Sequence, residues 1–178
     1  MISLVNLVTE ILSSLTLIGD VLLIFLVYKI LTKKDIKNNF LNKNGLLFAF
    51  IVALIATCGS LFFSEIAGYI PCKLCWYQRI FMYPLPILLG MALLKKDNKI
   101  SHYIIPLGIF GGIISIYHYS TQILKNSAIC SAESSTCASR IFISYGYITI
   151  PIMALTAFAL IIILTYFTNR SERRSKNE

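Results

Sequence analysis

The sequence predicts an all-α membrane protein with five transmembrane helices. Of its 178 residues, 57% are hydrophobic and only 13% are charged, and its mean hydropathy of +0.75 lies far above the soluble range. Five apolar runs approach the length that a helix needs to cross a bilayer, about 20 residues. Helices are expected in all five runs, because a backbone polar group left unpaired in hydrocarbon is costly and no alternating barrel pattern is present.

The five expected spans are separated by segments that hold clusters of Lys and Arg residues or the cysteine pairs. They cover residues 11–31, 46–63, 76–94, 103–119 and 148–167. The first run is not a cleaved signal, because no basic residue precedes it and its positive charges follow it. In the fourth run, Gly108 and Gly112 have the small-xxx-small spacing that favours close helix packing in membranes.

The positive charges predict how the chain crosses the membrane. Basic residues gather after the first span, after the third span and in the tail, and such clusters mark cytoplasmic segments. The N-terminus is therefore expected outside and the C-terminus in the cytoplasm. The net charge of +8 comes from these short clusters and not from a basic stripe interleaved with aromatic residues, so nucleic-acid binding is not expected.

Four of the five cysteines form two pairs that this topology places on the outer side. Cys72 and Cys75 precede the third span with two residues between them, the spacing of dithiol/disulfide redox sites. Cys130 and Cys137 lie in the outer segment between the fourth and fifth spans. Because Cys75 stands at the start of a helix, its dipole is expected to favour a reactive thiolate there. The remaining cysteine, Cys58, lies alone in the second span, and no role is assigned to it.

Further polar residues lie at similar depth or within the spans. Arg79 follows Cys75 by four residues, on the same helix face, and a charge inside an apolar helix indicates a functional role. His118 and Gln122 share one face near the outer end of the fourth span, where His118 by itself is more typical of an interfacial histidine than of a catalyst. Asp20 in the first span is expected to pair with a polar group that the sequence does not identify.

Alternatives to redox chemistry remain open at this level. Cys72 and Cys75 could form a structural disulfide or half of a zinc site completed by Cys130 and Cys137. Snorkelling of Arg79 to the headgroups is also compatible with its position. These readings correspond to a zinc- or disulfide-stapled membrane scaffold without redox turnover.

The segment P-C-K-L-C-W-Y-Q-R at residues 71–79, a second outer cysteine pair, and His118 with Gln122 together resemble the disulfide bond formation protein B family (DsbB). The nearer match is the short-loop, BdbC-like branch, because the loop between Cys130 and Cys137 is short. The resemblance implies a four-helix transmembrane domain at residues 46–168. Residues 1–45 would then add a transmembrane helix and a cytoplasmic loop, and residues 169–178 a basic cytoplasmic tail.

The resemblance implies an enzyme of the prokaryotic plasma membrane that passes electrons from a soluble or anchored thioredoxin-like thiol oxidase (DsbA- or BdbD-like) to a quinone, either ubiquinone or menaquinone. Cys130 would form the mixed disulfide with the partner, and Cys137 would exchange with Cys72. Cys75 would lie beside the quinone. The residues implied near the quinone are Arg79, His118 and Gln122, and the resemblance implies no metal ligand.

Overall fold

The computed structural model describes residues 2–32, 39–95, 100–124 and 143–175, and these are almost entirely helical. The elements are α1 (Ile2–Leu31), α2 (Asn39–Leu61), the π-helical turn η1 (Phe62–Ile66), α3 (Lys73–Met82), α4 (Pro84–Lys95), α5 (Ser101–Leu124) and α6 (Ile150–Ser175). Five helices are long and apolar enough to cross a membrane, and α3 with α4 counts as one of them. The expected all-α membrane architecture is confirmed.

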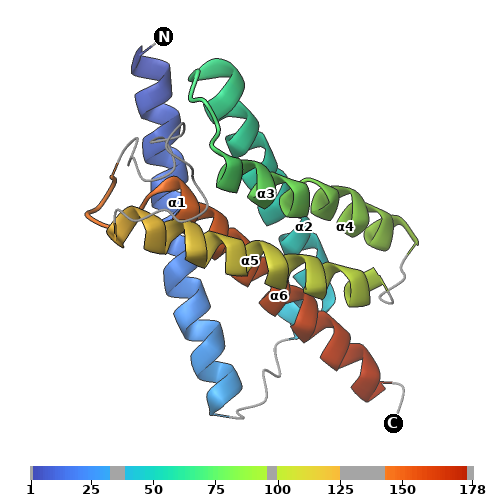
Figure 1. The fold of residues 1–178 in the computed structure, drawn as a ribbon. Coiled ribbons are helices and arrows are strands. Elements are labelled where there is room, and N and C mark those ends of the chain that lie inside the picture. The colour runs from blue at the N-terminus through green and yellow to red at the C-terminus, as the bar shows by residue number, and fades with distance from the viewer. Residues whose placement is uncertain (1, 33–38, 96–99, 125–142, 176–178) are drawn as a thin grey trace.

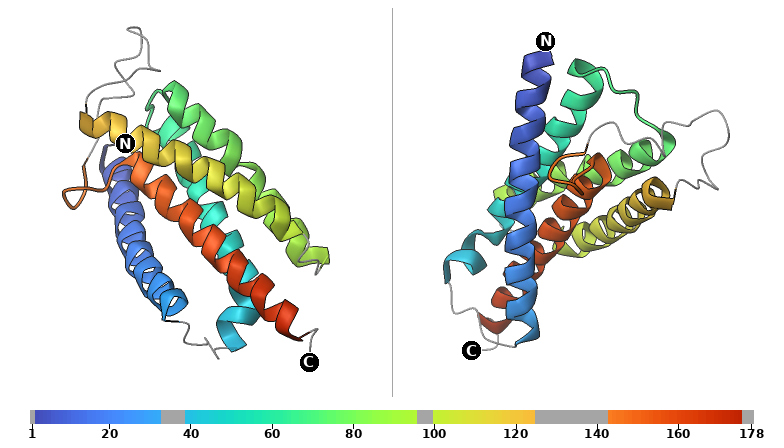
Figure 2. Two further views of the ribbon diagram at one scale, coloured as in Figure 1. Left: turned by 60° about the horizontal axis from the view of Figure 1, so that its bottom comes forward. Right: turned by 90° about the vertical axis from the view of Figure 1, so that its left-hand side faces the viewer.

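Helix α6 lies at the centre of the arrangement, in contact with α1, α2 and α5 (Figure 1). Together α2, α3–α4, α5 and α6 form a four-helix bundle, in which α3 packs on α5 and α4 packs on α2. Helix α1 lies outside this bundle, against α6, as the two views in Figure 2 show. The additional N-terminal helix is therefore attached to the bundle mainly through α6.

The third span is interrupted between Tyr83 and Pro84, where α3 ends and α4 begins. Proline has no N–H to donate to the preceding turn, so it is favoured at the first position of a helix. The amide of Tyr83 still bonds to the carbonyl of Arg79 at 2.9 Å, which completes the last turn of α3. The interruption separates α3, which begins at the cysteine pair, from α4, which packs in the core.

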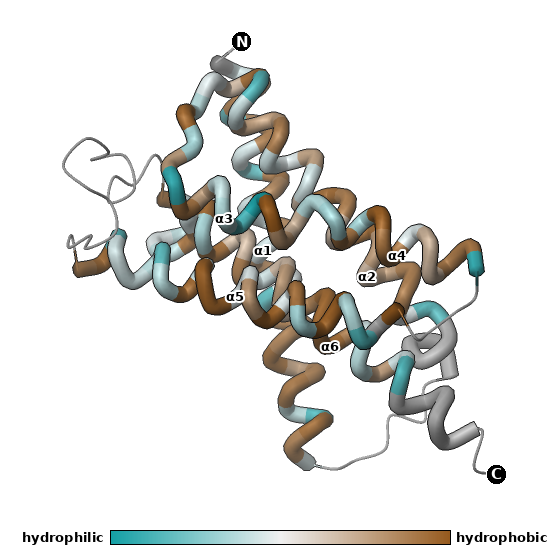
Figure 3. Tube along the Cα trace, turned by 45° about the vertical axis from the view of Figure 1, so that its right-hand side comes forward, coloured by the Kyte–Doolittle hydropathy of each residue, from teal (hydrophilic) through white to brown (hydrophobic). Residues whose placement is uncertain are grey.

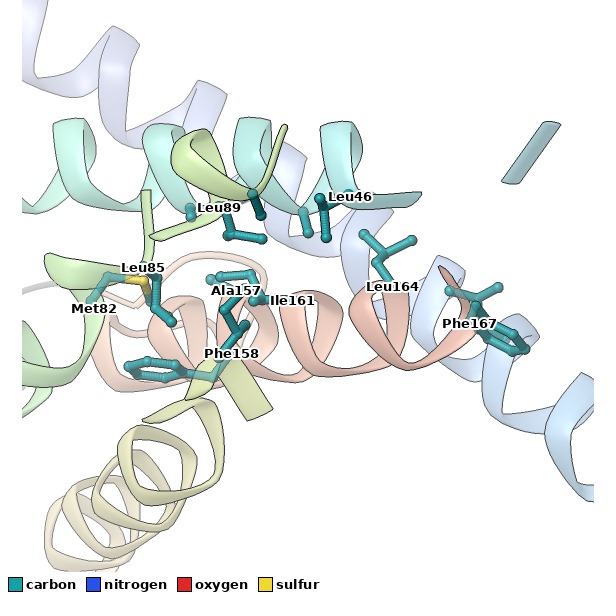
Figure 4. Packing of buried hydrophobic residues seen from close by; sticks show 14 residues of the cluster. Leu46, Met82, Leu85, Leu89, Ala157, Phe158, Ile161, Leu164 and Phe167 are labelled. Carbon is teal, nitrogen blue, oxygen red and sulfur yellow. The ribbon is translucent and has the colours of Figure 1, made fainter. Parts of the chain in front are cut away.

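The core of the bundle is formed by apolar side chains where α6 meets α2, α4 and α5. Figure 4 shows Leu85 and Leu89 of α4 beside Phe158 and Ile161 of α6, and all four side chains are fully buried. Around this core, many large apolar side chains point outward, and hydrophobic residues run along every helix (Figure 3). In a bilayer this outward apolar surface contacts lipid, so it is compatible with the spans.

Two glycines of α5 allow α5 and α6 to approach closely. A Cβ at Gly108 would lie 2.7 Å from Cγ1 of Ile162, and one at Gly111 would overlap the ring of Phe158. At Gly112 the nearest atom would be 3.9 Å away, an ordinary contact. The close approach expected at Gly108 is present, but its second member is Gly111 and not Gly112.

Candidate redox site

The cysteine pair is positioned by the segment that leads from η1 into α3. Gly68 takes a positive φ of 71°, a conformation in which a side chain would be strained, and lets the chain turn back toward the bundle. Cys72 then occupies the N-cap position of α3 in an extended conformation, and Cys75 lies in the first turn. The two sulfurs are 3.4 Å apart, so they can form a disulfide after a small movement.

The sulfur of Cys72 faces α5. Cys72 is buried, and its Sγ lies 3.7 Å from Nε2 of His118, which is also buried. Within the described ranges, Nδ1 of His118 has no hydrogen-bond partner. The hydrogen bond with Cys75 lowers the pKa of the Cys72 thiol from 9.0 to about 4, with a further lowering by His118 that burial opposes. The sequence placed the thiolate on Cys75 through the helix dipole, whereas these contacts favour a thiolate on Cys72.

Arg79 turns toward α2. Its Nε donates to Oγ of Ser60 and its terminal nitrogen donates to the carbonyl oxygen of Ser60, both at 3.0 Å. The guanidinium also lies over the ring of Trp76, 5.3 Å from its centroid, a cation–π arrangement. The side chain is thus held between α2 and Trp76 by three contacts.

Cys75 and Arg79 both line an apolar cavity of about 230 Å³ between α1, α2, α3 and α6. Most of its wall is aliphatic or aromatic, including Val52, Phe63 and Met153. The polar groups on the wall come mainly from α3 and from the Ser60 that holds Arg79. The cavity is therefore an apolar space with one thiol and one cation on the same helix, one turn apart.

The other candidate residues lie elsewhere. His118 and Gln122 are buried on α5 and do not line this cavity, and His118 lies on the far side of the cysteine pair, against Cys72. Cys130 and Cys137 lie outside the described residues.

Sequence reasoning did not identify Ser60 or Gln78 as parts of the site. Ser60 lies 19 residues before Arg79 and on another helix, so no local pattern connects the two. Gln78 lies within the segment at residues 71–79 that carries the family resemblance, and this segment could have pointed to it. Its Nε2 donates to Oγ of Ser115 at 3.1 Å, which ties α3 to α5 beside the cavity.

Comparison with known proteins agrees with this arrangement. The family model described as "Disulfide bond formation protein DsbB" matches residues 42–168. Disulfide bond formation protein C of Bacillus subtilis is 48% identical over 126 residues, which are 68% of this chain and 91% of that protein. The SPbeta prophage-derived disulfide bond formation protein B of the same organism is 45% identical over 67% of this chain and 81% of that protein.

A more distant relative is the probable disulfide formation protein of Coxiella burnetii, which is 39% identical over 66% of this chain and 82% of its own length. No solved structure matches the chain significantly. The matched region contains α3, α5 and most of α6, and with them both sulfurs of the described pair, Arg79 and His118. The chain belongs to the DsbB family of disulfide bond formation proteins.

Proposed function

We propose that this protein is a quinone-dependent protein-dithiol oxidoreductase of the prokaryotic plasma membrane. It reoxidises an extracytoplasmic thioredoxin-like thiol oxidase, and so sustains disulfide bond formation outside the cytoplasm. Membership of the family implies disulfide oxidoreductase activity. The observation that supports a quinone as electron acceptor is that Cys75 and Arg79 share the wall of one apolar cavity within the bundle.

The residues of the cavity fit such a group. A quinone is a flat apolar ring that carries two carbonyl oxygens, and the wall offers aliphatic and aromatic side chains with one strong hydrogen-bond donor, Arg79. The bonds to Ser60 use two of the donors of the guanidinium, which has five in all. The cavity of about 230 Å³ exceeds the roughly 150 Å³ that accommodates benzene in an engineered protein core.

When bound, a quinone supplies a two-electron acceptor that takes up two protons and becomes a hydroquinone. Cys72 and Cys75 would provide the two electrons and become joined by a disulfide. Because Cys72 is already a thiolate, one of the two protons would come from the thiol of Cys75 and the other from His118 or water. Arg79 places positive charge where negative charge develops on a carbonyl oxygen, the electrostatic principle of oxyanion sites. His118, at 3.7 Å from the sulfur of Cys72, can hold a proton at Nε2 while the disulfide forms and breaks.

The second cysteine pair would connect this centre to the partner protein. A thiolate of the reduced partner attacks the Cys130–Cys137 disulfide at Cys130, and the second partner thiol resolves the mixed disulfide and leaves the partner oxidised. Cys137 then attacks the Cys72–Cys75 disulfide at Cys72, and Cys130 resolves that bond. Each exchange moves two electrons inward. Both pairs lie on the extracytoplasmic side in this proposal, with the N-terminus outside and the C-terminus in the cytoplasm.

The test uses the purified full chain in lipid nanodiscs, with reduced dithiothreitol as thiol donor and a decyl-substituted benzoquinone as acceptor. Wild-type protein is expected to convert the quinone to hydroquinone, and Cys75→Ser is expected to lose this activity. Cys58→Ser is the matched control, because Cys58 is an exposed cysteine on α2 that does not line the cavity. Quinone reduction that continues undiminished in Cys75→Ser would contradict the proposal.

A zinc-stapled scaffold is a second candidate, favoured by one observation. The ligand atoms of Cys72, Cys75 and His118 lie within 4.8 Å of one another, a set that could bind a metal ion. In that case the purified protein would contain stoichiometric zinc, and its thiols would resist alkylation until a chelator removed the metal. Thiols that react at once in metal-free protein, together with quinone turnover, would exclude the scaffold.

A further inference from the structure

One wall of the cavity beside Cys75 lies outside the region that matches the family. The family match begins at residue 42, so α1 lies outside it. The match to the Bacillus subtilis relative covers 91% of that protein, and the remainder is shorter than the roughly 20 residues that a further span needs. Nevertheless Leu12, Leu15 and Thr16 of α1 line the same cavity as Cys75 and Arg79.

Helix α1 is fixed against the bundle by close packing. A Cβ at Gly19 would lie 3.1 Å from side-chain atoms of both Leu160 and Thr156, so the backbone of α1 approaches α6 closely there. On α2, a Cβ at Gly59 would lie 3.1 Å from Cδ1 of Leu12. The position of Leu12 at the cavity is therefore set by contacts with neighbouring backbone and not by free rotation of a lipid-facing helix.

Hydrogen bonds of Ser14 and Asp20 also fix α1 in place. The carboxylate of Asp20 accepts a hydrogen bond from the hydroxyl of Thr156 at 2.6 Å and another from the hydroxyl of Tyr147 at 2.9 Å. Ser14 and Tyr145 form a further hydroxyl contact at 3.2 Å. A carboxylate within a membrane helix is costly unless it is paired, so these bonds select one rotation of α1. That rotation directs Leu12 and Thr16 to the cavity.

Part of the wall of the cavity is also exposed on the surface of the protein. Three of the residues on its wall are also exposed, namely Leu15 by 44%, Ile55 of α2 by 40% and Ile70 by 78%. All three are aliphatic. An apolar chain attached to a ring in the cavity can therefore leave past these aliphatic side chains.

We propose that α1 is a specificity-determining wall for the acceptor, with Leu12 and Thr16 setting the width available to a quinone ring and Leu15 bordering the exit of its prenyl chain. This inference rests on the proposed function, because it takes a prenylated quinone as the occupant. Bulk added at Thr16 leaves less room for the ring. Removing the side chain of Leu12 enlarges the space and favours a two-ring naphthoquinone over a one-ring benzoquinone.

The test measures quinone binding and turnover in the full chain in nanodiscs. Trp76 is the single tryptophan of the sequence and lies under Arg79, so quenching of its fluorescence reports a bound quinone without need of turnover. The probes are a decyl-substituted benzoquinone and a prenylated naphthoquinone. Thr16→Phe is the main variant, and Ile18→Phe is its matched control, since Ile18 is 62% exposed on the outer face of α1.

Thr16→Phe is expected to weaken binding of the naphthoquinone about tenfold or more and that of the benzoquinone less, while Ile18→Phe changes both by less than about twofold. Leu12→Ala provides a second variant that adds no bulk, and is expected to raise the preference for the naphthoquinone about threefold or more. The role of α1 would be refuted if folded Thr16→Phe or Leu12→Ala bound both quinones with the dissociation constants of the wild-type protein and turned them over at the same rate. The proposed function would then remain intact. A wild-type protein that neither binds nor reduces either quinone would refute both.

Discussion

Ser60 is predicted to be a positioning residue for Arg79, and Ser60→Ala tests this with little other change. The substitution removes one oxygen atom, the Oγ that accepts from Nε of Arg79 at 3.0 Å and that also lies 3.5 Å from the hydroxyl of Tyr83. The bond from the terminal nitrogen to the carbonyl oxygen of residue 60 remains, and so does the stacking on Trp76. Arg79 is therefore expected to stay in the bundle but to lose the contact that fixes the rotation of its guanidinium.

The size of the effect follows from these three contacts. A hydrogen bond to a charged group contributes about 1.5–3 kcal/mol net. The lower value applies here, because the second hydrogen bond and a cation–π contact worth about 0.5–1 kcal/mol persist. A loss of about 1.5 kcal/mol of transition-state stabilisation corresponds to a roughly tenfold lower kcat/KM for the quinone.

The assay is steady-state reduction of the decyl-substituted benzoquinone by dithiothreitol, with a melting temperature recorded for each variant. The loss is expected in kcat, because the guanidinium acts on charge that develops during the reaction. Ser60→Thr keeps the hydroxyl and is expected to restore kcat to within about threefold. Ser120→Ala is the control, since its hydroxyl donates only to the carbonyl of Tyr117 on the same helix. A kcat unchanged within about twofold in a folded Ser60→Ala protein would refute this reasoning.

Two further predictions concern the thiols and the packing of α5. The ultraviolet absorbance of the thiolate is measured against pH in the reduced protein, and the signal of Cys72→Ser is subtracted. The Cys72 thiolate is expected to persist from pH 9 down toward its pKa of about 4, because Cys75 and then His118 lower that pKa. Because the pKa of Cys72 is lower in the folded protein, this thiolate stabilises the fold fully above the ordinary pKa of 9.0, and the stabilisation is lost as the pH falls toward 4. A titration midpoint near pH 9 would show that these contacts do not lower the pKa. Gly111→Ala is expected to destabilise the protein by about 1–3 kcal/mol in denaturant unfolding, because its Cβ would overlap a ring of α6. Gly112→Ala has 3.9 Å of clearance and is expected to be neutral or stabilising by up to about 1 kcal/mol, and equal effects of the two would refute the packing argument.

The sequence predicted the features that depend on one helix at a time. Five apolar runs correctly indicated five spans, and the spacing of Cys72 and Cys75 indicated sulfurs within reach of each other. The structure extends the first span to Ser3–Leu31, because polar residues in its outer half bond locally and do not end the helix. The hydroxyl of Thr9, for example, donates to the carbonyl of Val5.

What the sequence missed depends on which helices meet. The partners of Asp20 are Thr156 and Tyr147, more than a hundred residues away, and no local pattern connects them. Cys75 was expected to be the thiolate because its own helix begins there, but α5 brings His118 to Cys72. The proposed quinone contacts of His118 and Gln122 stay predictions, as do the roles of Cys130 and Cys137.

The two sulfurs of the described pair are separated by only two residues yet face different neighbours. One lies under α5 beside His118, and the other lies on the wall of the apolar cavity. In the proposed function, a thiol donor would approach the pair from the side of α5 and the oxidant from the side of the cavity. In the proposed cycle, electrons pass between them two at a time, through a bond that forms and breaks between Cys72 and Cys75. In this proposal a thiol donor never has to enter the apolar cavity, and the oxidant never has to leave it.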